Sequence, residues 1–379
     1  MADFTFYTDI TGNEKLDNPA NEFVRLANEG NLEYALGGFE ALVKDIAYIV
    51  TNNIKPLSIF AETGCFGSKA MFNVGVCLYK MGRYDEAAAS FIGALDLIKE
   101  DICPIAYDGE KRAVVIKIAK ALAELYAENK KDAVLCAQYM QEAACCYDDE
   151  AMKAVADYYR NGYGVPQSDR VAKIWENISG YSEFGRKYIW DNYFKLDFNK
   201  LMGLNPQGGK MSGDVIIPYG VTIIAKMPNL PNVIIPPTVK IIRSDAARAG
   251  ENKIVVFCGP IDEIGKGAFN MSMLLEEVYL PCTVGVIDDS AFDSCRKLTR
   301  IELPCISLER LGICAVSGCV SLESVVLDAR AIKYVDGSAL LKTDARITVK
   351  GTEKQTEKWS EYWSLYKPGD YHYVRYEKN

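Results

Sequence analysis

The chain has 379 residues, of which 49% are hydrophobic, and a formal net charge of -8. A chain of this length and apolar content can bury more than one core, so we expect two domains or a repeat array and no extensive disorder. The acidic residues are spread along the sequence without a Lys/Arg-rich block, which argues against nucleic acid as a partner.

Residues 1–23 lack a basic stretch followed by an apolar run. No later segment approaches the roughly 18 uncharged apolar residues that a membrane span needs. We therefore expect no membrane insertion and a cytoplasmic protein; the alternative is a cell-surface location reached by a non-standard route. We expect the twelve cysteines to be reduced, because several fall on repeat positions where a small buried hydrophobe fits.

The first half of the chain carries apolar residues at helical spacing. Between about residues 20 and 200 they recur three and four positions apart, and Gly, Asn or Asp mark the short breaks. Helices joined by short turns pack as antiparallel pairs. The sequence therefore predicts an α-helical repeat domain over residues 1–205.

The clearest helical unit covers residues 70–97, where apolar positions are spaced to line one face of each of two helices. Gly75 and Ala87 are small where the helix axes must approach closely, and Gly82 marks the turn between them. The unit resembles a tetratricopeptide repeat at these positions: Gly75, Leu78, Tyr84, Ala87, Phe91 and Ala94.

A second helical unit covers residues 149–178. Its loop carries Gly162 and Gly164, and Ala172 and Trp175 follow on the next helix. This pattern resembles the Sel-like relative of the tetratricopeptide repeat, in which a Gly-x-Gly-Val loop joins the two helices.

The tetratricopeptide resemblance implies a binding groove lined by the inner face of the first helix of each pair. Phe72 and Tyr79 could equally pack on a neighbouring helix pair. The groove positions that the resemblance points to are Lys69, Phe72, Val76, Tyr79 and Lys80.

After a turn-rich break at residues 205–209, short β-branched runs replace the long helices, so we place the second domain at residues 206–379. Apolar residues now recur every 23 or 24 positions. Among the aligned columns are Leu275, Leu298 and Leu322; Val278, Ile301 and Val325; Ile264, Ile287, Leu311 and Val335; and Ala268, Ala291, Ala315 and Ala339. Such columns predict stacked coils that bury their apolar residues against one another.

The repeat unit strongly resembles the BspA-type leucine-rich repeat and is clearest at residues 275–298. The predicted fold is thus an α+β multidomain repeat protein, with an α-helical tetratricopeptide/Sel-like array followed by a leucine-rich repeat β-solenoid. Residues 352–363 read as a short amphipathic helix that would cap the last coil.

The strand of each coil predicts a surface for a partner, because the residue between two buried positions points outward. Stacking turns these residues into columns that mix aromatic, apolar and charged groups, as protein recognition requires. The central column is Val256, Tyr279, Glu302, Val326 and Thr348, flanked by Glu277, Arg300 and Ser324. For any single one of these positions, a side chain that is only solvated and binds no partner is an equally good interpretation.

The sequence offers little material for catalysis. His372 is the single histidine and lies in a polar, aromatic tail, so histidine-based dyads and metal sites are not expected. Cys295 and Cys319 occupy one slot of successive coils, where the resemblance implies a packed free thiol. Residues 64–69 lack P-loop spacing and read as a turn before a helix. We therefore expect no enzyme activity, no cofactor and no metal.

These observations favour a non-catalytic scaffold or adaptor that binds a protein partner through its repeat surfaces. A cell-surface adhesin or host-interaction protein is the first alternative. A carbohydrate-binding module is the second, with stacking on tail aromatics that could equally pack as a cap: Trp359, Tyr362, Trp363, Tyr366, Tyr371, Tyr373 and Tyr376.

Overall fold

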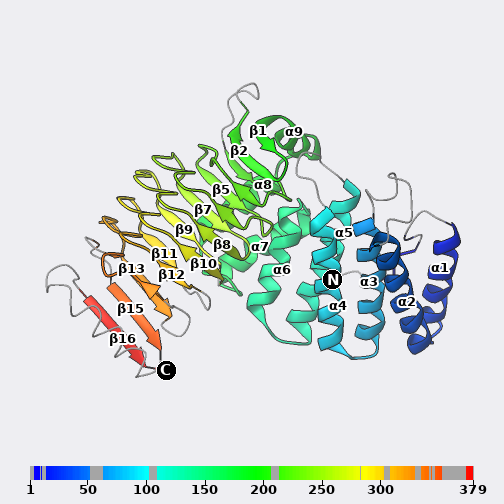
Figure 1. The fold of residues 1–379 in the computed structure, drawn as a ribbon. Coiled ribbons are helices and arrows are strands. Elements are labelled where there is room, and N and C mark those ends of the chain that lie inside the picture. The colour runs from blue at the N-terminus through cyan, green and yellow to red at the C-terminus, as the bar shows by residue number, and fades with distance from the viewer. Residues whose placement is uncertain are drawn as a thin grey trace. The chain divides into compact units, whose positions relative to one another are not determined.

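The computed structural model describes residues 4–8, 10, 14–51, 63–101, 109–205, 213–281, 283–302, 308–328, 334–340, 343, 346–351 and 373–378. The described residues divide into two compact units, one that ends at Ser179 and one that begins at Gly180. The first is helical and the second is a β-solenoid, which confirms the predicted fold class (Figure 1).

The helical unit consists of helices that pack on their neighbours in the chain (Figure 1). They are α1 (Glu14–Asn28), α2 (Leu32–Thr51), α3 (Thr63–Lys80), α4 (Tyr84–Asp101), α5 (Gly109–Glu128), α6 (Ala133–Cys145), α7 (Asp149–Asn161) and α8 (Asp169–Ser179). The turn predicted at residues 64–69 is wrong, because these residues form the beginning of α3.

Three glycines show why the helical pairs need residues without a side chain at certain positions. A β-carbon at Gly75 would lie 2.5 Å from the ring of Phe91, so glycine lets α3 and α4 approach, as the sequence predicts. Gly162 ends α7 in the left-handed conformation, and a β-carbon at Gly164 would lie 1.9 Å from the carbonyl oxygen of Ala133. The Gly-x-Gly loop is therefore fixed by backbone packing.

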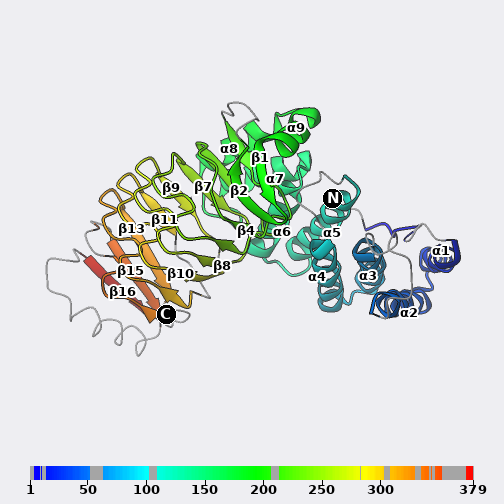
Figure 2. The ribbon, with the colours of Figure 1, turned by 45° about the horizontal axis from the view of Figure 1, so that its top comes forward.

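Within the described residues, the solenoid has two eight-stranded sheets (Figures 1 and 2). The first, called the β2–β14 sheet, contains β1 (Phe194–Asp197), β2 (Lys200–Leu204), β4 (Ile223–Ile224), β6 (Ile241–Ile242), β8 (Ile261–Ile264), β10 (Val284–Ile287), β12 (Arg310–Leu311) and β14 (Tyr334–Val335). The second, called the β3–β15 sheet, contains β3 (Asp214–Ile216), β5 (Asn232–Ile235), β7 (Ile254–Phe257), β9 (Glu277–Tyr279), β11 (Arg300–Glu302), β13 (Ser324–Asp328), β15 (Arg346–Gly351) and β16 (Tyr373–Lys378).

Strand pairing confirms the periodic columns. Ile264 lies opposite Ile287, which lies opposite Leu311, and Val278 lies opposite Ile301. These side chains belong to one continuous apolar core that runs through the solenoid. Each coil therefore relies on its neighbours for burial, as the spacing predicts.

The turns between the sheets repeat a left-handed backbone conformation at two columns. The first column is Asp245, Gly267, Ser290 and Cys314, and the second is Ala249, Met271, Ser294 and Gly318, all with φ between 52° and 67°. This conformation directs the amide of Gly267 to the carbonyl of Asp289 at 2.9 Å, and that of Met271 to the carbonyl of Asp293 at 2.9 Å. Hydrogen bonds between coils therefore hold residues other than glycine in a left-handed backbone conformation, which normally favours glycine.

The solenoid unit begins earlier than the predicted boundary after residue 205. Its first elements are α9 (Glu183–Tyr193) and the antiparallel hairpin β1–β2, and β2 then pairs in parallel with β4. Ile189, Phe194 and Leu201 pack with the solenoid core. These elements cap the first coil, whose apolar interior would otherwise be open to water.

The opposite end of the β3–β15 sheet is formed by β16, which pairs in parallel with β15. The sequence did not predict this strand. The capping helix predicted at residues 352–363 lies outside the described residues, as do His372 and the tail aromatics from Trp359 to Tyr371.

Candidate interaction surfaces

The register of the β3–β15 sheet confirms the alignment of the predicted strand-face columns. Val256 lies opposite Tyr279, and Tyr279 lies opposite Glu302. The remaining predicted neighbours are also paired: Glu277 with Arg300, Arg300 with Ser324, and Val326 with Thr348.

Burial contradicts the role predicted for the first part of these columns. Val256 is 0% exposed, Tyr279 is 2% exposed and Glu277 is 8% exposed, so none of them offers a free surface for a partner. The physical reason is visible in β7, whose residues 254–257 read Ile-Val-Val-Phe and are all buried. A strand that is apolar at every position is typical of burial on both faces.

The buried polar groups of β9 are satisfied locally. The hydroxyl of Tyr279 donates to the carboxylate of Glu277, and the guanidinium of the half-buried Arg300 lies 5.3 Å from the centre of the Tyr279 ring. These contacts give the three residues a structural role. The side chains of Glu302, Ser324, Val326 and Thr348 lie outside the described part of the structure, so their place in a binding surface stays a prediction.

The groove predicted on α3 is largely covered. Lys80 is exposed and Tyr79 is half-buried, whereas Phe72 and Val76 are each 0% exposed, so these two residues do not line an open groove. Lys69 is 9% exposed, and its ammonium lies 2.8 Å from the carboxylate of Glu110. The ring of Tyr7, from the beginning of the chain, lies edge-on to Phe72, with centroids 5.3 Å apart.

An accessible column instead follows the β2–β14 sheet. The aligned residues are Glu263, Val286, Arg310 and Tyr334, which we call the outer column. The first three are half-buried and Tyr334 is 46% exposed. Sequence reasoning missed this column because it assigned one strand to each coil, although the columns of Ile261 and Ile264 repeat with the same period outside that strand.

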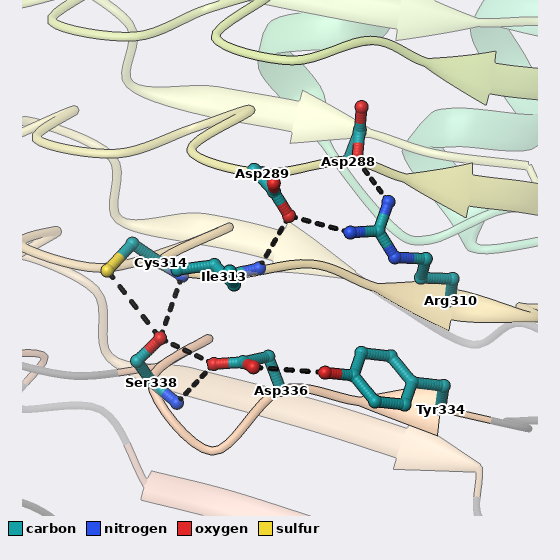
Figure 3. Close-up of polar contacts among 8 residues, drawn as sticks. All are labelled: Asp288, Asp289, Arg310, Ile313, Cys314, Tyr334, Asp336 and Ser338. Carbon is teal, nitrogen blue, oxygen red and sulfur yellow. Dashed lines mark hydrogen bonds and ion pairs between the residues drawn. The ribbon is translucent and has the colours of Figure 1, made fainter.

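Two acidic residues hold the arginine of the outer column (Figure 3). The guanidinium of Arg310 pairs with Asp288 and lies 2.8 Å from the carboxylate of Asp289, both on the preceding coil. Asp289 also accepts a hydrogen bond of 2.9 Å from the amide of Ile313. Although burial alone would lower the pKa of Arg310, the two carboxylates raise it above its ordinary value.

The tyrosine of the outer column is held in a similar way (Figure 3). The Tyr334 hydroxyl donates to Asp336 at 3.0 Å, and Asp336 also accepts from the amide of Ser338 at 2.9 Å and from its hydroxyl at 2.6 Å. Burial by itself would raise the pKa of Asp336, but these hydrogen bonds hold it below its ordinary value. Arg310 and Tyr334 are therefore fixed in place on adjacent strands.

Two cysteines of the solenoid, Cys295 and Cys319, are packed thiols. Cys295 donates to the carbonyl of Phe269 at 3.0 Å, and Cys319 donates to that of Phe292 at 3.2 Å. Both are 0% exposed. The neighbouring Cys319 and burial raise the pKa of Cys295 well above its ordinary value. The packed free thiols that the family resemblance implied are confirmed.

Within the described ranges, no cluster of three or more His, Cys, Asp or Glu side chains is arranged to hold a metal ion. In the same part of the chain, no helix combines the length and apolar composition needed to cross a membrane.

Comparison with known proteins bears on the solenoid. Residues 221–345 match the BspA type leucine-rich repeat region in six copies. No curated protein matches the chain. The crystal structure of the pneumococcal vaccine antigen PcpA is similar, with 12% identity over 50% of this chain and a TM-score of 0.29, a likeness too distant to bear on fold or function. The match spans 49% of that antigen chain. The solenoid of this protein therefore contains a region, residues 221–345, that matches the BspA-type leucine-rich repeat.

Proposed function

We propose that the protein is a non-catalytic scaffold or adaptor that binds a protein partner, and that the outer column of the β2–β14 sheet contacts this partner. The observation that carries the proposal is the pair formed by Arg310 and Tyr334, which are accessible, adjacent and each held by carboxylates. Arginine and tyrosine are enriched among the residues that dominate binding energy. Because their geometry is already fixed, less conformational entropy is lost on binding.

The chemistry of the outer column also favours a protein over other ligands. Glu263 and Arg310 carry opposite charges and Val286 between them is apolar, so the column offers mixed contacts along several strands. Such an extended, rigid strip suits a protein surface, and a solenoid provides it by stacking. We propose no nucleic acid, membrane or cofactor as a partner.

The proposal extends to the type of helical repeat. We assign the helical unit to the tetratricopeptide/Sel-like class, supported by the close approach at Gly75 and by the loop geometry at Gly162 and Gly164. The adhesin alternative and the two possible locations stay predictions from sequence. So does the carbohydrate alternative, since the side chains on which it rests lie outside the described residues.

The test places a photo-activated cross-linker at Val286, between the two charged members of the outer column. We expect a discrete adduct in native lysate that weakens in the double variant Tyr334→Ala/Arg310→Ala. With the partner purified from that adduct, the double variant should bind about tenfold or more weakly, because hot-spot truncations cost about 2 kcal/mol or more.

A matched control is Tyr188→Ala on α9, since Tyr188 is 46% exposed, the same fraction as Tyr334. It should leave both the adduct and the affinity unchanged. Equal adducts in the wild type and the double variant would show that the outer column is not the binding surface.

A further inference from the structure

Residues 4–8 and 10 lie along α3 without forming a helix or strand of their own. Tyr7 contacts Phe72 near the middle of α3, whereas Phe4 stacks on Tyr79 near its end. The segment therefore runs antiparallel to the helix. We call residues 4–8, together with Ile10, the N-terminal arm.

A single side chain of α3 recognises the backbone of the arm. The amide of Tyr7 donates to the Asn73 side-chain oxygen at 2.7 Å, and the Asn73 side-chain nitrogen donates to the carbonyl of Tyr7 at 2.9 Å. Asn73 is 0% exposed. A buried side-chain amide that bonds to both the N–H and the C=O of one residue can bind any extended peptide, because it makes no contact that depends on the peptide's side chain.

Each aromatic side chain of the arm contacts a different aromatic residue of the helical unit. The Phe4 ring lies flat on Tyr79, with centroids 4.0 Å apart and planes 8° apart. Phe6 is 9% exposed and its ring centre lies 5.9 Å from that of Phe39 on α2. Each ring therefore has its own aromatic partner, which gives geometric selectivity.

Lysines complete the lining of the groove. The Lys117 ammonium on α5 lies 4.3 Å from the centre of the Tyr7 ring and 3.0 Å from the hydroxyl of Thr5. The Lys80 ammonium lies 5.1 Å from the centre of the Phe6 ring. Lysine over an aromatic face is a favourable contact that an aliphatic side chain could not replace.

The arm contains both buried and exposed positions. Thr5 and Thr8 are exposed, while Ile10 is 0% exposed and packs with Leu42, Ile46 and other apolar residues of the unit. Anchoring side chains separated by exposed threonines are typical of a peptide laid into a groove. Every contact that holds Phe4 to Tyr7 could also be made by a separate chain.

We propose that the groove lined by α2, α3 and α5 is a peptide-binding site that the N-terminal arm occupies as a resident ligand. The partner that the groove fits is an extended segment of another protein with aromatic side chains at its first, third and fourth positions, in the pattern of Phe4, Phe6 and Tyr7. The covalently attached arm competes at a high effective concentration, on the order of millimolar for a short linker, so such a partner binds only when it displaces the arm. This site goes beyond the proposed function, because it involves none of the residues of the outer column.

The test uses the full chain and a fluorescent peptide with the sequence of residues 3–10. In the variant Phe4→Ala/Tyr7→Ala the arm loses two of its anchors while every groove residue is kept. We expect the peptide to bind this variant saturably in fluorescence anisotropy, and to bind the wild type at least about tenfold more weakly because the intact arm competes.

Two controls make the result specific. A peptide in which the three aromatic residues are replaced by alanine should not bind, and Asn73→Ala added to the arm variant should abolish binding of the original peptide. Tyr334→Ala should leave peptide binding unchanged, so failure of this proposal and failure of the outer-column proposal are distinguishable.

Three results would overturn the proposal. The first is an arm variant that melts cooperatively, with wild-type helical circular dichroism, but binds no peptide. The second is an arm variant that no longer folds, which would make the arm a core element and not a ligand. The third is a wild-type dimer that the arm variant loses, which would make a second copy of this chain the occupant.

Discussion

The ring of Phe292 lies flat against the ring of Phe269 from the preceding coil, with centroids 5.0 Å apart and planes 6° apart. Both side chains are 0% exposed. The same two residues provide the carbonyls that accept hydrogen bonds from Cys295 and Cys319. The stacked turns therefore join successive coils by aromatic packing and by thiol hydrogen bonds at once.

Truncating one of these rings should destabilise the solenoid strongly. We expect Phe292→Ala to lower the free energy of unfolding by about 3–5 kcal/mol, because it removes a buried ring and leaves a cavity between coils. Urea denaturation followed by circular dichroism measures the change. Phe198→Ala, at a side chain that is 79% exposed, is the control and should change stability by less than about 0.5 kcal/mol. Similar losses in the two variants would contradict the role of the stacked ring.

The protein should become more stable when Met271, one residue with a left-handed backbone, is replaced by glycine. Met271 has φ of 57° and is 44% exposed, so Met271→Gly removes backbone strain at little cost in packing. Strain relief of about 1–2 kcal/mol, less a glycine entropy cost of about 0.5–1 kcal/mol, gives an expected gain of about 0–1.5 kcal/mol.

Met273 provides a matched control, because it is 38% exposed and is not among the residues with positive φ. Met273→Gly should destabilise by about 0.5–1 kcal/mol, since only the entropy cost remains. Thermal melts of the two variants should therefore shift in opposite directions, and shifts of the same sign would show that the left-handed backbone is not strained.

Replacing Asn252 by aspartate should cause a loss of stability that depends on pH. Its side-chain nitrogen donates to the carbonyls of Pro228 at 2.9 Å and Leu230 at 2.7 Å, and the residue is 1% exposed. In Asn252→Asp an ionised carboxylate would face two carbonyl oxygens, so we expect a loss of about 3 kcal/mol or more at pH 7. The loss should shrink as the pH falls towards the ordinary pKa of aspartate, because a protonated carboxyl can donate again.

Chemical denaturation at pH 7 and near pH 4 measures this difference. Asn199→Asp, at an exposed position of the β1–β2 hairpin, should be close to neutral at both values. A loss for Asn252→Asp that does not depend on pH would mean that the side chain acts through its shape alone.

Thiol reactivity should follow burial. Desolvation raises the pKa of Cys77 to about 12, and Cys77 and Cys295 are each 0% exposed, so neither thiolate is accessible in the folded protein. Cys314 is half-buried. Brief alkylation with iodoacetamide at pH 8, followed by peptide mapping, should modify Cys314 well before the other two, because the thiolate is the reacting species. Early modification of Cys295 would contradict the packed-thiol assignment.

The sequence predicted the parts of the fold that repeat. The column that contains Ile264, Ile287 and Leu311 predicted which residues of successive coils lie opposite one another, because stacked coils bury equivalent positions. It did not predict β16 or the cap formed by α9 and the β1–β2 hairpin, since each occurs once and leaves no period. Tertiary contacts, and not periodicity, decide such elements.

The candidate surfaces were harder to predict than the fold. Alternation along a strand tells which side chains point away from the core, but it cannot tell whether that outer face is covered elsewhere in the structure. The fully apolar run at residues 254–257 was the available signal that Val256 would be buried. The N-terminal arm was missed because Phe4, Phe6 and Tyr7 form too short a pattern to indicate their neighbours.

The one-to-one parallel pairing of coils has a consequence for how this protein can change over generations. Ile287 pairs in parallel with Ile264 of the preceding coil and with Leu311 of the following coil. The two sides of a coil therefore make equivalent contacts. Duplicating or deleting one whole coil between the terminal elements would lengthen or shorten the domain and leave every other pairing intact. Length is therefore an adjustable property of this architecture, whereas an insertion of a few residues within a strand would break the ladder on both sides.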